Sequence, residues 1–316
     1  MENKKIITVF GATGAQGGGL VNAIMADRNS DYKVRAVTRN SQSEKAKALS
    51  QMGAEVVEAD INNVKSIEKV LKDAKAAYFV TFFWEHFSAE KEYQQIKNFI
   101  QAAKGADLEH IVWSTLEDTR NWVPLDDNRM PTLQGHYKVP HFDSKGAADK
   151  LFSEAGLPVT FLRTSFYWDN FIHFGMGPQN GGDGNYYIAF PMDDKTLAGM
   201  AAEDIGKCAY GIFKRGNTFI GKTVGIVGEK LTGNEMASKL SEALGINVIY
   251  NNVSPETYRN FGFPGADDLG NMFQFKRDFN NDFNAVRDEA LSLELNPEMQ
   301  NFDKWLSKNG SQIPIN

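Results

Sequence analysis

Residues 6–18 read IITVFGATGAQGG, an apolar run followed by the glycines Gly11, Gly14 and Gly17. The apolar run predicts a buried strand, and the residues from 16 onward predict a helix. Glycines between a strand and a helix allow a tight turn, a close approach of the backbone to a pyrophosphate, and tight packing of the helix. The free N–H groups at the helix start would face the phosphates. This stretch predicts the first turn of a dinucleotide-binding Rossmann fold; the alternative is a plain connection between strand and helix.

The chain up to residue 165 repeats this alternation of a short apolar run and an amphipathic helix. The predicted strands are residues 6–10, 34–37, 55–58, 77–80, 111–114 and 159–162. The predicted helices are residues 16–27, 43–52, 64–72, 90–104 and 142–155. Several strands are apolar throughout, which is typical of a parallel sheet buried on both faces. We therefore predict an α/β class, with a doubly wound parallel sheet of the Rossmann type.

Beyond residue 165 the alternation loosens, with a glycine-rich break at 175–184. Helices are predicted at 203–213 and 234–244, and a strand at 223–227. We expect two units: a nucleotide-binding unit at 1–165, and a smaller, α-rich unit at 166–316 that returns at least one strand to the main sheet. The loop 117–140 contains three prolines and is long enough to suggest a lid or a binding segment.

Composition excludes several classes of protein. The 34 basic and 40 acidic residues give a net charge of -6, and no basic cluster is long enough to bind a nucleic-acid backbone. No run approaches the roughly 18 apolar residues of a membrane span, and the chain enters a strand without a signal peptide, so we expect a cytoplasmic protein. The single cysteine, Cys208, has core spacing on a predicted helix, and the five histidines show no metal-binding pattern.

The end of the second strand indicates which dinucleotide is bound. NAD-specific folds place an acidic residue there, but this chain has Thr38 and Arg39. A guanidinium without a carboxylate favours the 2′-phosphate of NADP(H); the alternative is a solvated surface arginine. Asp60 follows the third strand, where it could also be a helix cap. Thr81, Phe82 and Phe83 follow the fourth, where the phenylalanines could also be core residues.

A catalytic tyrosine is missing. Short-chain dehydrogenases place a tyrosine four residues before a lysine, which holds the cofactor ribose and lowers the tyrosine pKa. Here Lys145 has His141 in that position, and Tyr137 lies outside the predicted helix. Lys145 and His141 are therefore the candidate catalytic residues, Lys145 for ribose contact and His141 for proton relay. The alternatives are a surface lysine and a histidine without a chemical role.

Two strand ends supply further candidates. Ser114 and Thr115 end the fifth strand, where such enzymes keep a serine that binds the substrate oxygen. Residues 162–170, LRTSFYWDN, leave the sixth strand with an aromatic and polar cluster that this fold carries past the nicotinamide. Aromatic packing with a helix cap is the alternative for this cluster. The cofactor contacts expected from it are Tyr167, Trp168, Asp169 and Asn170.

Five segments together resemble a known family. They are VFGATGAQGG (9–18), VRAVTRN (34–40), FDSKG (142–146), YWDN (167–170) and NFGFPGADDLGNMFQF (260–275). This combination resembles the NmrA-like branch of the atypical short-chain dehydrogenases, in particular the animal NADP-sensing proteins, over nearly the whole chain. The resemblance implies NADP(H) binding, loss of the tyrosine, and action as a redox sensor or transcriptional co-regulator through protein partners.

The resemblance also implies positions for the cofactor-binding residues. The implied contacts are Gly11, Ala12, Thr13, Gly14, Ala15, Gln16 and Gly17 at the pyrophosphate; Thr38, Arg39, Asn40 and Ser43 at the 2′-phosphate; Asp60 and Ile61 near the adenine; Thr81, Phe82 and Phe83 beside the adenosine half; and Lys145, Tyr167, Trp168, Asp169 and Asn170 along the nicotinamide half. Two positions depart from the family pattern. Ser43 stands where relatives have a basic residue, and Gln94 where they have a lysine.

Three functions remain open from the sequence. The first is an NADP(H)-binding redox sensor that acts through protein partners or a homodimer, in the cytoplasm or the nucleus. The second is an NADPH-dependent reductase of a small carbonyl or quinone substrate, and the third is a scaffold with a vestigial Rossmann fold. For the sensor, the loop 117–140 and the segment 262–275, with the exposed-looking Phe263 and Phe273, are the expected moving parts.

Overall fold

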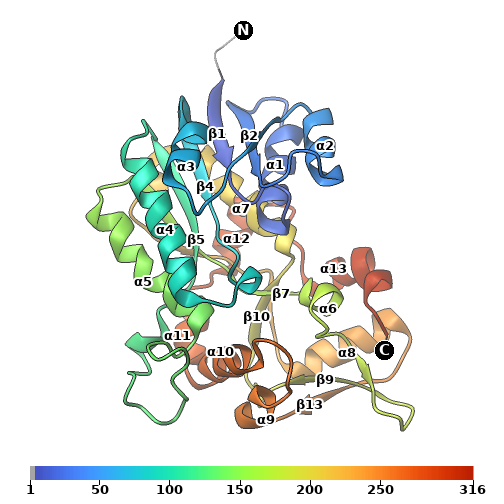
Figure 1. Ribbon diagram of the computed structural model, residues 1–316. Helices are drawn as coiled ribbons and strands as arrows, with labels where there is room; N and C mark the ends of the chain where they lie inside the picture. Colours follow the sequence, from blue (N-terminus) through green and yellow to red (C-terminus); the bar gives the residue numbers. More distant parts are fainter. Residues whose placement is uncertain (1–3, 316) are drawn as a thin grey trace.

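A parallel β-sheet forms the centre of the molecule in the computed structural model, which describes residues 4–315 (Figure 1). Within those residues the sheet has seven strands in the order β11-β6-β5-β4-β1-β2-β3. The strands are β1 (Lys5–Val9), β2 (Tyr32–Thr38), β3 (Glu55–Glu58), β4 (Ala74–Phe79), β5 (His110–Thr115), β6 (Val159–Arg163) and β11 (Thr223–Gly225). All neighbouring pairs are parallel. The doubly wound Rossmann fold predicted from the sequence is confirmed.

Helices cover both faces of the sheet, so that its apolar strands are buried on both sides. They are α1 (Ala15–Ala26), α2 (Glu44–Gln51), α7 (Ala202–Lys214) and α12 (Glu289–Leu295) on one face, and α3 (Val64–Leu71), α4 (Ala89–Lys104) and α5 (Pro140–Glu154) on the other. Each face of the sheet has its own apolar core. The core under α1 includes Leu20, Val21 and Ile24, and the core under α4 includes Ile96 and Phe99. Figure 1 shows α4 and α5 on the opposite side of the sheet from α1 and α7.

Helices α1 and α7 approach each other more closely than side chains would allow. A Cβ atom at Gly19 would lie 2.3 Å from the carbonyl oxygen of Glu203, and one at Gly206 would lie 2.0 Å from the amide nitrogen of Leu20. Only glycine fits at both positions, because real Cβ atoms do not come so close to backbone atoms. The glycine-rich start of α1 is thus packed against a helix from the second half of the chain.

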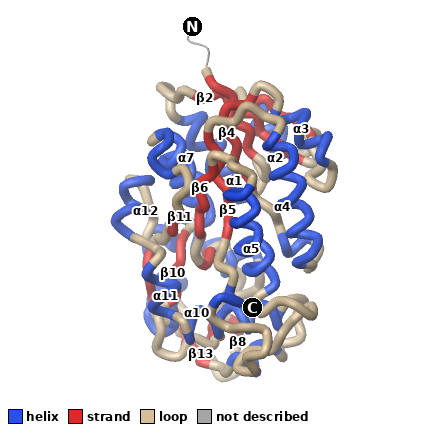
Figure 2. The backbone as a smooth tube through the Cα atoms, turned by 90° about the vertical axis from the view of Figure 1, so that its left-hand side faces the viewer, coloured by secondary structure: helices blue, strands red, loops and turns tan. Residues whose placement is uncertain are grey.

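The C-terminal region lies at one end of the main sheet (Figure 2). In the described part of the chain it contains two small sheets, ordered β12-β10-β7 and β13-β9-β8. Their strands are β7 (Phe166–Tyr167), β8 (Gln179–Asn180), β9 (Tyr186–Phe190), β10 (Leu197–Met200), β12 (Glu229–Leu231) and β13 (Val248–Asn252). The helices of the region are α6 (Asn170–His173), α8 (Gly233–Leu244), α9 (Pro255–Arg259), α10 (Ala266–Asp278), α11 (Asn280–Ala285) and α13 (Phe302–Asn309). The short strands were not predicted.

A buried ion pair joins this region to the main sheet. Arg287, between α11 and α12, has a fully buried side chain and donates hydrogen bonds to Glu117, which follows β5, at 2.7 and 3.2 Å. It also donates to the carbonyl oxygen of Thr164, which follows β6, at 2.6 Å. The guanidinium lowers the pKa of the Glu117 carboxyl against the opposing effect of burial. The C-terminal region is therefore held directly over the carboxyl ends of β5 and β6.

The long loop 117–140 is fastened at both sides. Asn271 of α10 donates a hydrogen bond to the Pro131 carbonyl at 2.9 Å, and the buried Asp143 of α5 accepts one from the Thr119 amide at 2.8 Å. The loop contains the short 3-10 helix η2 (Thr119–Asn121); the others are η1 (Phe83–Glu85), η3 (Gly216–Phe219) and η4 (Gly310–Gln312). None of the described helices is long and apolar enough to cross a membrane.

Candidate functional site

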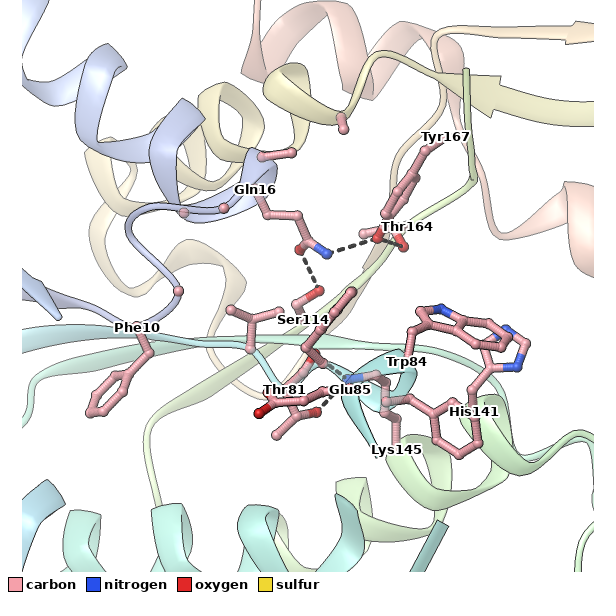
Figure 3. Close-up of a pocket in the computed structure, with 18 of the residues that line it drawn as sticks. Phe10, Gln16, Thr81, Trp84, Glu85, Ser114, His141, Lys145, Thr164 and Tyr167 are labelled. Carbon is pink, nitrogen blue, oxygen red and sulfur yellow. Dashed lines mark hydrogen bonds between the residues drawn. The ribbon is translucent and has the colours of Figure 1, made fainter. Parts of the chain in front are cut away.

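One cavity of about 840 Å³ follows the carboxyl ends of β1, β2, β4, β5 and β6. Ligands of doubly wound sheets bind at this edge, because the loops there diverge and leave a crevice. Its lining begins at the glycine loop, passes β2 and β4, and ends between α5, α6 and α10. Figure 3 shows the central part, where Gln16, Ser114, Thr81 and Lys145 lie around the same space. The described residues contain no cluster of side chains that could hold a metal ion.

The N-terminus of α1 opens into one end of the cavity. Gly14 precedes the helix and provides no side-chain cap, and the first turn has no acidic residue. Gly11 adopts a φ of 63°, which favours glycine, and a Cβ atom at Gly17 would lie 2.4 Å from the Gly11 carbonyl oxygen. The loop is therefore compact, and the first N–H groups of α1 are left to bind an anion.

Two cations stand beside this anion site, at the end of β2. Arg39 is an exposed side chain that pairs with Glu85 of η1, and Lys45 lies in the first turn of α2. Both line the cavity, as does the intervening Ser43, which caps α2 by accepting the Ala46 amide at 3.3 Å. The two cations make this end of the cavity suitable for a second phosphate.

The side chain of Lys145 reaches the cavity floor from α5 and is buried among polar partners. Its ammonium lies 3.0 Å from the carboxylate of Glu92 on α4 and donates to the hydroxyl and the carbonyl oxygen of Thr81. Glu92 is fully buried and also accepts hydrogen bonds from Thr81 at 2.6 Å and from Ser144 at 3.0 Å. Because every polar neighbour is satisfied, Lys145 is held in one position.

His141 lies one turn before Lys145, at the start of α5. Its Nδ1 atom bonds to the carboxylate of Asp268, and its backbone amide donates to the same carboxylate at 3.1 Å. The ring lies 4.8 Å from the Trp84 ring, centroid to centroid, and lines the cavity beside it (Figure 3). A carboxylate on Nδ1 fixes the ring orientation and leaves Nε2 as the nitrogen without an assigned partner.

Gln16 connects the glycine loop to the middle of the cavity. Its Oε1 atom accepts hydrogen bonds from Tyr78 at 2.7 Å and Ser114 at 2.8 Å, and its Nε2 donates to the Tyr167 hydroxyl at 2.8 Å. Burial raises the pKa of Tyr167 to about 12, with hydrogen bonds from Thr164 and Gln16 opposing the shift. Tyr167 thus stays protonated and does not act as a base near neutral pH.

Most of the predicted site residues come together around this cavity. Those that line it are Gly11, Thr13, Gly14, Ala15, Gln16, Gly17, Thr38, Arg39, Asn40, Ser43, Asp60, Ile61, Thr81, Phe82, Phe83, Ser114, Thr115, His141, Lys145, Tyr167, Asp169 and Asn170. As predicted, Tyr137 lies outside α5, which begins at Pro140. Cys208 is buried, and burial raises the pKa of its thiol.

Two of the predicted cofactor contacts do not line the cavity, and one residue expected to be exposed is buried. Trp168 does not line the cavity, because its ring is 1% exposed and packs 5.2 Å from the Phe302 ring. Ala12, within the glycine loop, is equally buried, and its amide donates to the Val37 carbonyl oxygen. Phe273 is completely buried rather than exposed, since it faces the core side of α10. Phe263 is 38% exposed, as its position suggested.

Several cavity residues were missed from the sequence. Lys45 and Lys91 lie in the first turns of α2 and α4 and line the cavity. They supply positive charge near the positions where Ser43 and Gln94 depart from the family pattern, whereas Gln94 itself points to Asn98. The signal for both lysines was their place in a first helical turn at the ligand-binding edge. Other missed residues are Glu92, Asp268 and Lys276, which carry no local sequence signal because their partners are distant in the chain.

Comparisons with known proteins agree with this architecture. A model of the NmrA-like family matches residues 3–306. The chain is 27% identical over 291 residues to the NmrA-like family domain-containing oxidoreductase lnbB of Aspergillus flavus, and this match covers 86% of the chain and 83% of that protein.

Two solved structures share the fold. NmrA, described as a negative transcriptional regulator, superimposes with a TM-score of 0.78 at 22% identity, covering 96% of this chain and 95% of that one. The triphenylmethane reductase of Citrobacter sp., solved in complex with NADP(H), superimposes with a TM-score of 0.73 at 21% identity, covering 96% and 99% of the two chains.

Replacing Glu92 tests how Lys145 is held. Glu92→Leu would leave the Lys145 ammonium buried without a counter-charge, so we expect the free energy of unfolding to fall by about 3–5 kcal/mol. Urea denaturation measures this loss. As a control, Glu109→Gln removes the partner of the exposed Lys5 and should change stability by less than about 1 kcal/mol. A Glu92→Leu protein as stable as this control would contradict the assigned role of Glu92.

Proposed function

Because the chain belongs to the NmrA-like family, we propose that it binds NADP(H) and reduces a small carbonyl or quinone compound in the described cavity. The observation that carries this proposal is the continuity of the cavity. A single space joins the open N-terminus of α1, the cations at the end of β2, the held ammonium of Lys145 and an apolar end at α10. An anion-binding site alone would not need the last two features.

The residues present fit NADP(H). The start of α1 offers N–H groups to the pyrophosphate, and Arg39 and Lys45 offer two positive charges to the 2′-phosphate. The position that carries an acidic residue in NAD-specific folds carries Thr38 and Arg39. The Citrobacter reductase of similar fold is solved with NADP(H), which supports the same choice for this chain.

Different residues of the chain would have different roles in such a reduction. When bound, NADPH would supply a hydride for the substrate carbon. Lys145, fixed by Glu92 and Thr81, would position the ribose of the dinucleotide. His141, oriented by Asp268, would relay protons from the cavity wall. The Gln16 and Ser114 contact would place a hydroxyl beside the substrate oxygen.

A second function, regulation, is favoured by the Arg39–Glu85 pair. A 2′-phosphate at Arg39 would compete with Glu85, which belongs to η1. The neighbouring Phe82 and Phe87 are 53% and 41% exposed and offer an apolar surface to a protein partner. We therefore propose, second, that nucleotide occupancy shifts η1 and changes binding to protein partners or a second copy of the chain, in the cytoplasm or the nucleus. Because both redox forms carry the 2′-phosphate, this contact alone would report occupancy.

Cofactor choice is expected to depend on Arg39. Arg39→Ala should weaken NADP(H) binding by about 10-fold to 100-fold and leave NAD(H) binding nearly unchanged, since hydrogen bonds to a charged group contribute roughly 1.5–3 kcal/mol. The exposure of the side chain favours the lower end of this range. Titration calorimetry with both dinucleotides measures the ratio. Equal weakening of the two would refute the 2′-phosphate assignment.

Turnover is expected to depend on Lys145. Mixing the protein anaerobically with NADPH and a panel of quinones and carbonyl compounds should give oxidation at the nicotinamide absorbance band. Lys145→Met should lower the rate by about 10²-fold or more, and His141→Gln by much less. Circular dichroism and NADPH binding separate a chemical effect from unfolding. A Lys145→Met protein that folds and retains full turnover would remove this mechanism.

The regulatory proposal predicts changes in backbone protection. Hydrogen exchange of the NADP+ and NADPH forms should differ from that of the apo protein at residues 82–87, 117–140 and 262–275, with a coupling of about 1–3 kcal/mol to dimerisation or partner binding. Glu85→Gln should make residues 82–87 of the apo protein resemble the bound form. Sedimentation follows the oligomeric state. Identical exchange and sedimentation in all three states would exclude regulation by nucleotide.

A further inference from the structure

Helix α10 presents one face to the far end of the cavity. Asp268, Met272 and Lys276 are spaced by four residues and therefore lie along the same side of the helix. Met272 and Lys276 line the cavity, and Asp268 holds the cavity residue His141. The remaining lining at this end is mostly apolar and includes Phe142 and Phe166. Lys276 is the basic residue that α10 contributes to this mostly apolar end of the cavity.

The ammonium of Lys276 is buried but has no polar partner. The residue is 3% exposed, and no hydrogen bond or ion pair joins its Nζ atom to another described residue. Its neighbours are the rings of Phe283, Phe142, Phe166 and Phe273, with Nζ 5.2–6.0 Å from the ring centroids. Ring faces attract a cation weakly and do not replace hydrogen bonds to its three N–H donors, so these donors remain available to a group in the cavity.

The nearby charged groups do not provide a partner for the Lys276 ammonium either. The charged groups acting on Lys276 are Arg287 and Glu117, and these two already pair with each other. His141 and His173 line the same cavity, the former engaged with Asp268. Burial, and next the charge of Arg287, lower the pKa of Lys276 to about 7. A charged lysine in these surroundings lowers the free energy of unfolding. Destabilising groups of this kind are typical of ligand-binding sites.

Lys276 differs in this respect from the other cavity groups that carry protons. Lys145 is saturated by Glu92 and Thr81, and Tyr167 keeps its proton because burial raises its pKa. An unpaired ammonium that loses its proton near neutral pH is suited to give it to a substrate oxygen. The aromatic rings around it would stack on a flat substrate.

We propose that Lys276 binds the carbonyl oxygen of an aromatic carbonyl compound and is the proton donor that replaces the missing tyrosine. This deepens the proposed reductase function and rests on it. The carbonyl carbon would gain the hydride of the reduced dinucleotide, and the carbonyl oxygen would gain a proton from Lys276 Nζ. The products are the alcohol and the neutral amine, which solvent reprotonates through the open part of the cavity.

Binding of two matched probes tests recognition without turnover. The probes are 2-acetylnaphthalene and 2-ethylnaphthalene, which have the same skeleton but only one of which has a carbonyl oxygen. The wild-type protein should bind the ketone more tightly. Lys276→Met should weaken the ketone by about 10-fold and leave the hydrocarbon unchanged. Quenching of tryptophan fluorescence measures both, because Trp84 lines the cavity. Lys222→Met, which removes an exposed lysine outside the cavity, is the control.

A stability measurement shows whether the variant folds and whether Lys276 is unpaired. Because the pKa of Lys276 is lowered from 10.5 to about 7, the folded state loses stability as the pH falls from about 10.5 to about 7, and the loss is complete below that pH. Lys276→Met should therefore raise the urea midpoint, and by more at about pH 6 than at about pH 9. A lysine with an overlooked counter-charge would give the opposite sign and would overturn the proposal.

Steady-state kinetics separate this proposal from the reductase function itself. With 2-acetylnaphthalene and NADPH, kcat/KM of the wild-type protein should fall above about pH 7, and Lys276→Met should lose this pH dependence together with most of kcat. If the ketone binds through Lys276 but NADPH is never oxidised, the proposed reductase function fails. If turnover is unchanged in Lys276→Met, the reductase function stands and Lys276 is not the proton donor.

Discussion

The position of Arg287 determines how the two halves of the molecule meet. Its guanidinium is buried and donates to the Glu117 carboxylate and to the Thr164 carbonyl, both just past the ends of central strands. An isolated charge at that depth would be costly, so the geometry is tightly specified: moving the C-terminal region would separate the charges inside the protein. The parallel sheet supplies a row of strand ends, and Arg287 fixes the α10 and α11 segment above them. The cavity lies between the strand ends and this segment, so its position depends on both the sheet and Arg287.

Sequence patterns were informative throughout the first half of the chain; in the second half they predicted α7, α8 and β11 but not the short strands. The glycine loop, the apolar strands and the helices of the first half follow local periodicity, and they were predicted with small errors at their ends. The strands β7, β8, β10 and β12 are two to four residues long, which is too short for a periodic pattern. Trp168 could not be placed from the sequence, because an aromatic residue beside a strand end can face either the core or the ligand, and here it packs against Phe302.

The same limit applies to the candidate site. Residues that follow directly after strands could be placed, because parallel strands bring their carboxyl ends together. Glu92, Asp268 and Lys276 could not be placed, since each acts on a group or a space formed by distant segments.

Two lysines of the cavity have different environments that the sequence does not indicate. Lys145 is neutralised by a buried carboxylate and has a fixed position, whereas Lys276 is surrounded by rings and retains unsatisfied donors. These two lysine side chains therefore differ in chemistry because their neighbours differ.

The contact between α1 and α7 has a consequence for how the chain acquires its structure. The glycines Gly19 and Gly206 let the two backbones touch, so that one side of α1 packs against a helix that is synthesised much later. A nascent chain that had reached only residue 165 would lack the α7 backbone against which Gly19 packs. The phosphate loop would then rest on a helix without its packing partner. Its final packing would arise only once the second half has been made and has docked.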